Sequence, residues 1–252
     1  TGGVRPSTTR VQTDRCSARR QRTEAQPHKE CTLTSSSLAA ISRKLENAYG
    51  IAVGTYSPEG LRARLHIIDS EIAEGFFADT VVLVEGKSDK AALIAAARLN
   101  GIDFEAKGIA VLVADGKNSL DRPASIFQEF SIPTYLIWDC DRNTKGGIED
   151  LRANHALQLL SGCNPENIFD AKTIVSNKFA CFEYNIEHTL KLEIGDILFE
   201  DLINKARDTY GIIRQKDVLK IPAAMTSVLL EASKNGARAK TVDDIVNKIC
   251  EM

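Results

Sequence analysis

Apolar residues in the middle of the chain alternate between short continuous runs and stripes with helical spacing. Three runs are rich in β-branched or aromatic residues and predict buried strands: 81–84, 109–113 and 134–138. Helices are predicted at 88–99, 119–130 and 148–160, and further strands at 172–175 and 179–182. This alternation predicts an α/β fold, in which a parallel sheet is covered by helices on both faces.

The sequence on either side of this region has helical spacing only. Residues 38–48 are predicted as a helix, and Ser57-Pro58-Glu59-Gly60 marks a turn or a helix start. One long helix is predicted over 61–77, with a buried stripe of Leu61, Leu65, Ile68, Ile72 and Phe76. Three further helical stripes cover the last third of the chain. We therefore divide the chain into a helical lead-in at 38–78, an α/β domain at 79–190 and a helical subdomain at 191–252.

Residues 1–37 differ from the rest in composition. They are rich in Ser, Thr and Arg, contain no aromatic residue, and are basic between Arg15 and Arg22. We expect a disordered tail or linker, with a nucleic-acid-binding arm as the alternative. The first residue is Thr rather than Met, so we expect a fragment or a processed form.

The overall composition gives no sign of a nucleic-acid or membrane partner. The 252 residues are 43% hydrophobic and 26% charged, with a net charge of -2, so a DNA-acting enzyme would need locally concentrated positive charge. No apolar run approaches about 20 residues, and no signal-peptide pattern opens the chain. The six cysteines form no CxxC pair, and Cys140 and Cys181 lie in predicted strands, where we expect buried thiols. We expect a cytoplasmic protein.

Acidic residues follow the first and third predicted strands. Glu85 and Asp89 come after 81–84, whereas Asp139 and Asp141 come after 134–138 and, two apart on an extended segment, should point to the same side. If these strands are neighbours, the four carboxylates meet at one edge and repel by about 4 kcal/mol per pair at ~4 Å. Mg²⁺ or Mn²⁺ would offset this, and two such ions could support phosphodiester cleavage. The alternative is that each acid caps a helix or lies in a solvated turn.

Two turns partly resemble a phosphate-binding loop. Both Gly86-Lys87-Ser88 and Gly116-Lys117-Asn118 lack the required earlier glycine, which argues against ATP binding by such a loop. Lys117, Asn118 and Ser119 could still bind a phosphate at a helix start, or form an ordinary charged turn. A phosphatase with an Asp139 nucleophile is less favoured, because the Asp-x-Asp follows the third strand rather than the first.

The order of these elements resembles the Toprim domain of topoisomerases, primases and certain nucleases. Its marks are a glutamate after the first strand and an Asp-x-Asp after the third. Over residues 60–235 the chain most resembles the carboxy-terminal region of the OLD (overcoming lysogenization defect) family of nucleases. The matching segments are Glu74–Ala78, Val82–Asp89, Gly116–Ser119, Trp138–Asp141, Phe182–Glu187 and Lys220–Pro222.

The resemblance implies DNA cleavage with two divalent ions, Mg²⁺ or Mn²⁺, in a Toprim catalytic domain over 79–190 whose site is completed by 191–252. Glu85 and Asp139 would hold one ion. The second would be held by Asp89, Asp141 and either Glu183 or Glu187. Lys220 would stabilise charge on the phosphate in the transition state, or else be a lysine that only flanks a helix. Phosphate or DNA contacts are expected at Gly86, Lys87, Gly116, Lys117 and Ser119.

The resemblance also implies partners. These are DNA and an ATPase domain in the full-length protein, with a possible homo-oligomer and no membrane. Two alternatives remain: a non-catalytic Toprim-like module for DNA binding or assembly, and an enzyme that transfers phosphoryl groups on small substrates.

Overall fold

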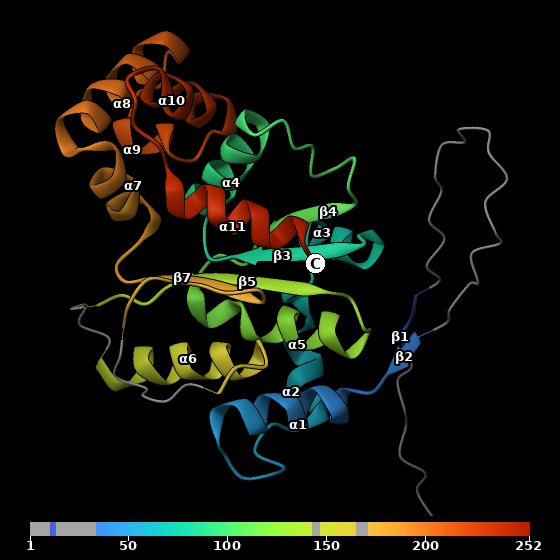
Figure 1. The fold of residues 1–252 in the computed structure, drawn as a ribbon. Helices are drawn as coiled ribbons and strands as arrows, with labels where there is room; N and C mark the ends of the chain where they lie inside the picture. The colour runs from blue at the N-terminus through green and yellow to red at the C-terminus, as the bar shows by residue number, and fades with distance from the viewer. Residues whose placement is uncertain (1–10, 14–33, 143–146, 165–170) are drawn as a thin grey trace, which may run out of the picture.

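A five-stranded sheet lies at the centre of the protein, in the order β4-β3-β5-β7-β6 (Figure 1). The structure is a computed structural model and describes residues 11–13, 34–142, 147–164 and 171–252. The strands are β3 (Thr80–Val84), β4 (Ile109–Val113), β5 (Thr134–Asp139), β6 (Ile174–Val175) and β7 (Phe179–Phe182). All neighbours pair in parallel except β6, which pairs antiparallel with β7. The α/β prediction is confirmed, but the sheet is mixed, because β6 and β7 form a short hairpin.

Helices cover both faces of the sheet (Figure 1). One face carries α4 (Lys87–Leu99), α7 (Ile186–Ile194), α8 (Asp196–Tyr210), α9 (Gln215–Val218), α10 (Pro222–Lys234) and α11 (Lys240–Cys250). The other carries α1 (Leu38–Tyr49), α2 (Pro58–Ala63), α3 (Ser70–Glu74), α5 (Asp121–Glu129) and α6 (Gly147–Leu160). Three short 3-10 helices are η1 (Leu65–Ile67), η2 (Gly75–Phe77) and η3 (Lys117–Ser119). The helices predicted within the α/β region are confirmed to within a few residues.

The central strand β3 divides the hydrophobic core in two. Its residues alternate, so that Val82 and Val84 pack toward α4 and α10, while Val81 and Leu83 pack toward α1 and α5. All four are fully buried. The continuous apolar run therefore reflects a strand that is covered on both faces.

Helix α4 packs closely against other helices because one side of it is made of small residues. The buried alanines are Ala91, Ala92, Ala95, Ala96 and Ala97. They allow α10 and α11 to approach α4, and the three helices share one core with the sheet. The helical character of the last third is confirmed, whereas the domain boundaries remain a prediction.

The prediction of one long helix over 61–77 is wrong. This stretch consists of α2, η1, α3 and η2. Ile68 leaves helical geometry at φ -83 and ψ 74, and the Asp69 carboxylate then caps α3 by accepting a hydrogen bond from the Ile72 amide at 2.8 Å. The apolar stripe still lies on one core, since Leu61 and Ile72 are buried and the others pack beside them. Spacing predicted the buried face but not the breaks.

The first 37 residues lie mostly outside the part that the structure describes, including the basic stretch from Arg15 to Arg22. The described residues there form an antiparallel pair, β1 (Val11–Thr13) with β2 (Thr34–Ser36), which the sequence did not predict. Ser57 caps α2 as expected, accepting a hydrogen bond from the Gly60 amide at 3.0 Å. Within the described ranges, every helix is too short or too polar to cross a membrane.

Replacing Gly75 with alanine should destabilise the fold. A Cβ at this position would lie 2.5 Å from Phe127 Cζ and 2.8 Å from Leu112 Cδ1, so the core between η2, β4 and α5 would have to shift. We expect Gly75→Ala to lower the free energy of unfolding by about 1 to 3 kcal/mol, measured by urea denaturation.

The matched control is Gly60→Ala, because Gly60 is exposed and a Cβ there meets only Ser57 Oγ at 3.1 Å. Its effect should stay below about 1 kcal/mol. Equal losses in the two variants would show that the contacts of Gly75 do not limit packing.

Candidate metal centre

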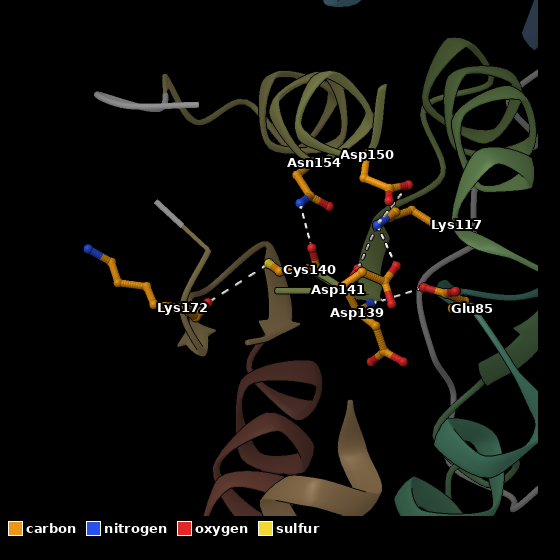
Figure 2. Close-up of polar contacts among 8 residues, drawn as sticks. All are labelled: Glu85, Lys117, Asp139, Cys140, Asp141, Asp150, Asn154 and Lys172. Atoms are coloured by element: carbon orange, nitrogen blue, oxygen red, sulfur yellow. Dashed lines mark hydrogen bonds and ion pairs between the residues drawn. The ribbon is translucent and has the colours of Figure 1, made fainter. Parts of the chain in front are cut away.

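The parallel register of β3 and β5 brings the predicted acidic residues to one edge of the sheet. Val84 lies opposite Ile137, so Glu85 and Asp139 follow at the carboxyl ends of adjacent strands. The Glu85 side chain links the two ends directly, because its Oε2 accepts a hydrogen bond from the Asp139 amide at 3.0 Å (Figure 2). The predicted adjacency of the two strands is confirmed.

Asp89 lies in the first turn of α4 and is almost completely buried, at 4% exposed. Its Oδ2 accepts a hydrogen bond from the Gly86 amide at 2.8 Å, so it caps the helix as the alternative reading proposed. The pKa of Asp89 is raised to about 7. Burial is the main cause, the hydrogen bond from Gly86 opposes it, and the negative charge of Glu85 adds to it. Asp89 therefore both caps α4 and belongs to the acidic cluster.

Asp139 is the most perturbed carboxyl of the cluster. Its pKa is raised to about 9, mainly by burial and also by the charges of Asp89, Glu85 and Asp141. Its Oδ1 is buried without a hydrogen-bond partner in the described part of the chain. Burial also raises the pKa of Glu85, although the Asp139 amide opposes this by stabilising the carboxylate. A bound cation would stabilise the ionised form of this buried carboxyl group.

Lys117 is a buried cation within the same cluster. Its side chain is only 4% exposed, and its ammonium lies 2.6 Å from Asp141 Oδ2 and 3.7 Å from Asp150 Oδ1. It also donates to the backbone carbonyl of Asp139 at 3.1 Å. Figure 2 shows the ammonium between Asp141 and Asp150, with the Asp139 carboxylate directed away from it. These contacts place the ammonium inside the site. The expected contact of Lys117 with a phosphate remains a prediction.

Asp150 was not singled out in the sequence. It belongs to the first turn of α6, where an acidic residue is ordinarily explained by the helix dipole. The position of α6 beside the end of β5 brings it to Lys117 (Figure 2). The available signal was an acid in the first turn of the helix that follows the Asp-x-Asp.

Asp139 and Asp141 do not point to the same side, which corrects the prediction from an extended segment. Strand β5 ends at Asp139, and Asp141 adopts a left-handed conformation with φ 55. The backbone on either side is held by bonds from the Cys140 amide to the Phe182 carbonyl at 2.7 Å and from the Arg142 amide to the Glu183 carbonyl at 3.0 Å. The turn directs the Asp141 carboxylate to Lys117, as Figure 2 shows.

The opposite turn depends on a glycine. Gly116 has φ 123 and ψ 151, a backbone conformation that residues other than glycine rarely adopt. Its amide donates a hydrogen bond to the Glu85 carbonyl at 2.9 Å. This turn leads into η3 and places Lys117 within contact of Asp141 and Asp150. Gly116 thus positions Lys117, while its expected contact with phosphate remains a prediction.

Cys140 lies between the two aspartates and anchors the loop to the interior. Its carbonyl accepts a hydrogen bond from Asn154 Nδ2 at 3.0 Å, and its thiol lies 3.9 Å from the Lys172 carbonyl (Figure 2). Cys140 and Cys181 are both buried free thiols, which confirms that expectation.

The two late acids lie in different surroundings. Glu183 directly follows β7 and forms an ion pair with Arg142, beside the end of β5. Glu187 lies in the first turn of α7 and pairs with Lys191 at 2.9 Å. Their roles as metal ligands remain predictions, but Glu183 shares the strand edge with Asp139.

The remaining predicted residues have no described contact with the acidic cluster, Gly86 excepted, whose amide donates to Asp89. Lys220 is exposed and pairs with Asp217 at 3.5 Å. Gly86 precedes α4, Lys87 is exposed at its first position, and Ser119 ends η3. Their expected contacts with phosphate or DNA remain predictions.

The donors of the cluster fit a hard divalent cation. They are carboxylate oxygens, which Mg²⁺ and Mn²⁺ prefer, and one of them, Asp139 Oδ1, has no hydrogen-bond partner among the described residues. Within the described ranges, however, no three or more His, Cys, Asp or Glu side chains form a ready-made metal cage. Side-chain adjustment would accompany metal binding.

Residues 76–141 match the model of the Overcoming lysogenization defect protein-like, TOPRIM domain. This segment is an OLD-like Toprim domain. Toprim domains of this kind generally belong to metal-binding modules of nuclease and primase type. The match runs from η2 through both acidic clusters and includes Glu85, Asp89, Asp139 and Asp141.

Solved structures of OLD proteins are similar to the chain at low identity. The C-terminal region of the Burkholderia pseudomallei OLD protein is 16% identical, with 70% of this chain and 98% of that chain covered and a TM-score of 0.44. The C-terminal region of the Xanthomonas campestris pv. campestris OLD protein, phased with platinum, is 17% identical, with 71% and 95% covered and a TM-score of 0.44. The comparison with curated proteins gives no match.

The metal-free Toprim domain should lose stability as the pH rises. The folded-state pKa of Asp139, about 9, exceeds its ordinary value of 3.8, so between these values the folded state binds more protons than the unfolded state. The carboxyl therefore contributes stability at low pH that is lost toward pH 9. We expect Asp139→Asn to be more stable than the wild type in EDTA at pH 8, by about 1 to 3 kcal/mol, with a smaller difference at pH 5.

Thermal unfolding between pH 5 and 9 measures this difference. Asp115→Asn is the control, since Asp115 is exposed in the neighbouring turn and its φ of 54 suits asparagine. A destabilised Asp139→Asn protein at pH 8 would contradict the repulsion inferred for the site.

Proposed function

We propose that this chain is the nuclease module of an OLD-like protein and cleaves phosphodiester bonds in DNA with two divalent ions, Mg²⁺ or Mn²⁺. The observation that carries the proposal is the buried Asp139 carboxylate, with a pKa of about 9 and a partnerless oxygen, inside an OLD-like Toprim segment. Such a perturbed acid at the end of a parallel strand is typical of a functional site rather than of a structural ion pair.

The acids divide into two sets of ligands. Glu85 and Asp139 would hold one ion, while Asp89, Asp141 and either Glu183 or Glu187 would hold the second. Ions bound there would supply an activated water and stabilise the charge of the leaving oxygen. The hydrogen bond from the Asp139 amide to Glu85 fixes these two ligands relative to each other.

Positive charge near the edge would bind the DNA backbone. The exposed Lys87 lies at the start of α4, where amide groups and the helix dipole favour phosphate. Lys220 would approach the scissile phosphate and stabilise the charge that develops in the transition state. We further propose that the full-length protein is cytoplasmic, couples this module to an ATPase domain and can form homo-oligomers.

Asp139→Asn should abolish cleavage while leaving the fold intact. The substitution removes the charge of a central ligand, and loss of several kcal/mol of charge stabilisation corresponds to a rate reduction of at least about 100-fold. Conversion of supercoiled plasmid to nicked and linear forms in Mn²⁺ measures the rate.

Two controls accompany this assay. Asp115→Asn should cut like the wild type, and addition of EDTA should stop both proteins. Full activity in Asp139→Asn would contradict the proposal. Retention of DNA without metal and without cleavage would favour the alternative, a non-catalytic Toprim-like module.

Lys220→Ala should slow cleavage without changing Mn²⁺ affinity. The ammonium is expected to act on the phosphate and not on the metal ligands, so the rate constant should fall by about 10- to 100-fold. The exposed pair with Asp217 contributes little to stability, and the variant should fold normally. Single-turnover cleavage and Mn²⁺ titration provide the two measurements.

Lys216→Ala is the matched control, because Lys216 is an exposed lysine on the neighbouring helix α9. If both variants lose activity to the same extent, Lys220 contributes only general positive charge.

A further inference from the structure

The acidic cluster has two halves that differ in what neutralises them. On one side, Glu85, Asp89 and Asp139 share raised pKa values, and the Asp139 carboxylate points away from Lys117 (Figure 2). On the other side, Asp141 and Asp150 face the Lys117 ammonium at 2.6 and 3.7 Å. One half therefore contains a cation supplied by the chain itself.

The ammonium is held as a part of the interior. The Lys117 side chain is 4% exposed, and its third contact is the Asp139 carbonyl at 3.1 Å, so it ties the end of β5 to η3. The two turns that bring lysine and aspartate together have unusual backbones, φ 123 at Gly116 and φ 55 at Asp141. A merely solvated lysine would need neither turn.

A divalent ion at Asp141 would meet this ammonium directly. Both cations would use the Asp141 carboxylate, and like charges repel strongly at such short separation. Asp141 is one of the ligands assigned to the second ion in the proposed function. Binding of that ion and the present position of Lys117 are therefore mutually exclusive.

We propose that Lys117 is an internal competitor of the second divalent ion: it holds Asp141 until that ion displaces it. This inference rests on the proposed function of the same site. The first ion binds at Glu85 and Asp139, where the ammonium makes no described contact with a carboxylate. The second ion binds more weakly, because its binding includes the release of Lys117.

Lys117→Gln tests the competition through Mn²⁺ binding. Wild-type protein should show two binding steps of unequal affinity in calorimetry or in electron paramagnetic resonance of free Mn²⁺. In Lys117→Gln the second step should tighten by at least about tenfold, the equivalent of 1.4 kcal/mol, while the first changes less than about twofold. Lys216→Gln, which removes an exposed lysine to which the proposed function gives no role, should leave both steps unchanged. An unchanged or weakened second step in Lys117→Gln would overturn the proposal.

Amine labelling tests the same point in wild-type protein and does not depend on the folding of a variant. With an amine-reactive ester and mass spectrometry, Lys117 should be protected without metal and at Mn²⁺ concentrations that fill the first step. It should become reactive when the second step fills, whereas Lys87 is labelled throughout. Continued protection of Lys117 at saturating Mn²⁺ would overturn the competition.

The outcomes separate this inference from the proposed function. If Mn²⁺ binds in two steps and releases Lys117 but DNA is not cut, the nuclease assignment fails and the competition stands. If DNA is cut while Lys117 stays protected, the competition fails and the nuclease assignment stands. Wild-type protein that binds no Mn²⁺ would overturn both.

Discussion

Carboxylates at the carboxyl ends of two adjacent parallel strands repel one another, and the site is arranged around that repulsion. The structure offsets it in three ways. Burial and neighbouring charge raise the pKa of Asp139, so that a proton can be held where charge is unfavourable. The Asp139 amide donates to Glu85, and the Lys117 ammonium binds Asp141. Each of these contacts is one that a bound divalent ion would strengthen or replace.

The acids stay together because packing elsewhere fixes the elements that carry them. Strands β3 and β5 are buried on both faces, so their register cannot slip without moving apolar side chains into water. Helix α4 is held by α10 and α11 against its alanine-rich side, which fixes Asp89 in the first turn. The sequence that follows the Toprim segment therefore stabilises the site even where it contributes no ligand. Apolar packing in the core therefore offsets the repulsion among the carboxylates at the edge of the sheet.

How far the sequence predicts this protein depends on the range of the interactions involved. Strands 81–84 and 134–138, and their adjacency, could be predicted, because a continuous β-branched run is typical of a strand that is buried on both faces of a parallel sheet. The helix breaks at Ile68 and Asp69 could not be predicted, because the spacing of apolar residues indicates a buried face but does not indicate where a side chain caps a new helix. Asp150 reaches Lys117 only because α6 returns beside β5, a contact between residues 33 positions apart.

The two Gly-Lys turns show why a motif alone does not assign a role. Lys87 and Lys117 both follow a glycine after a parallel strand, yet Lys87 is exposed and Lys117 is buried among carboxylates. With all five acids of the cluster ionised, Lys117 alone leaves the edge strongly negative, and a DNA backbone would be repelled. Two divalent ions would add positive charge and offset most of this negative charge. In the proposed function, metal binding would then precede close approach of the phosphate, and the affinity of the second ion would set when the edge can accept DNA.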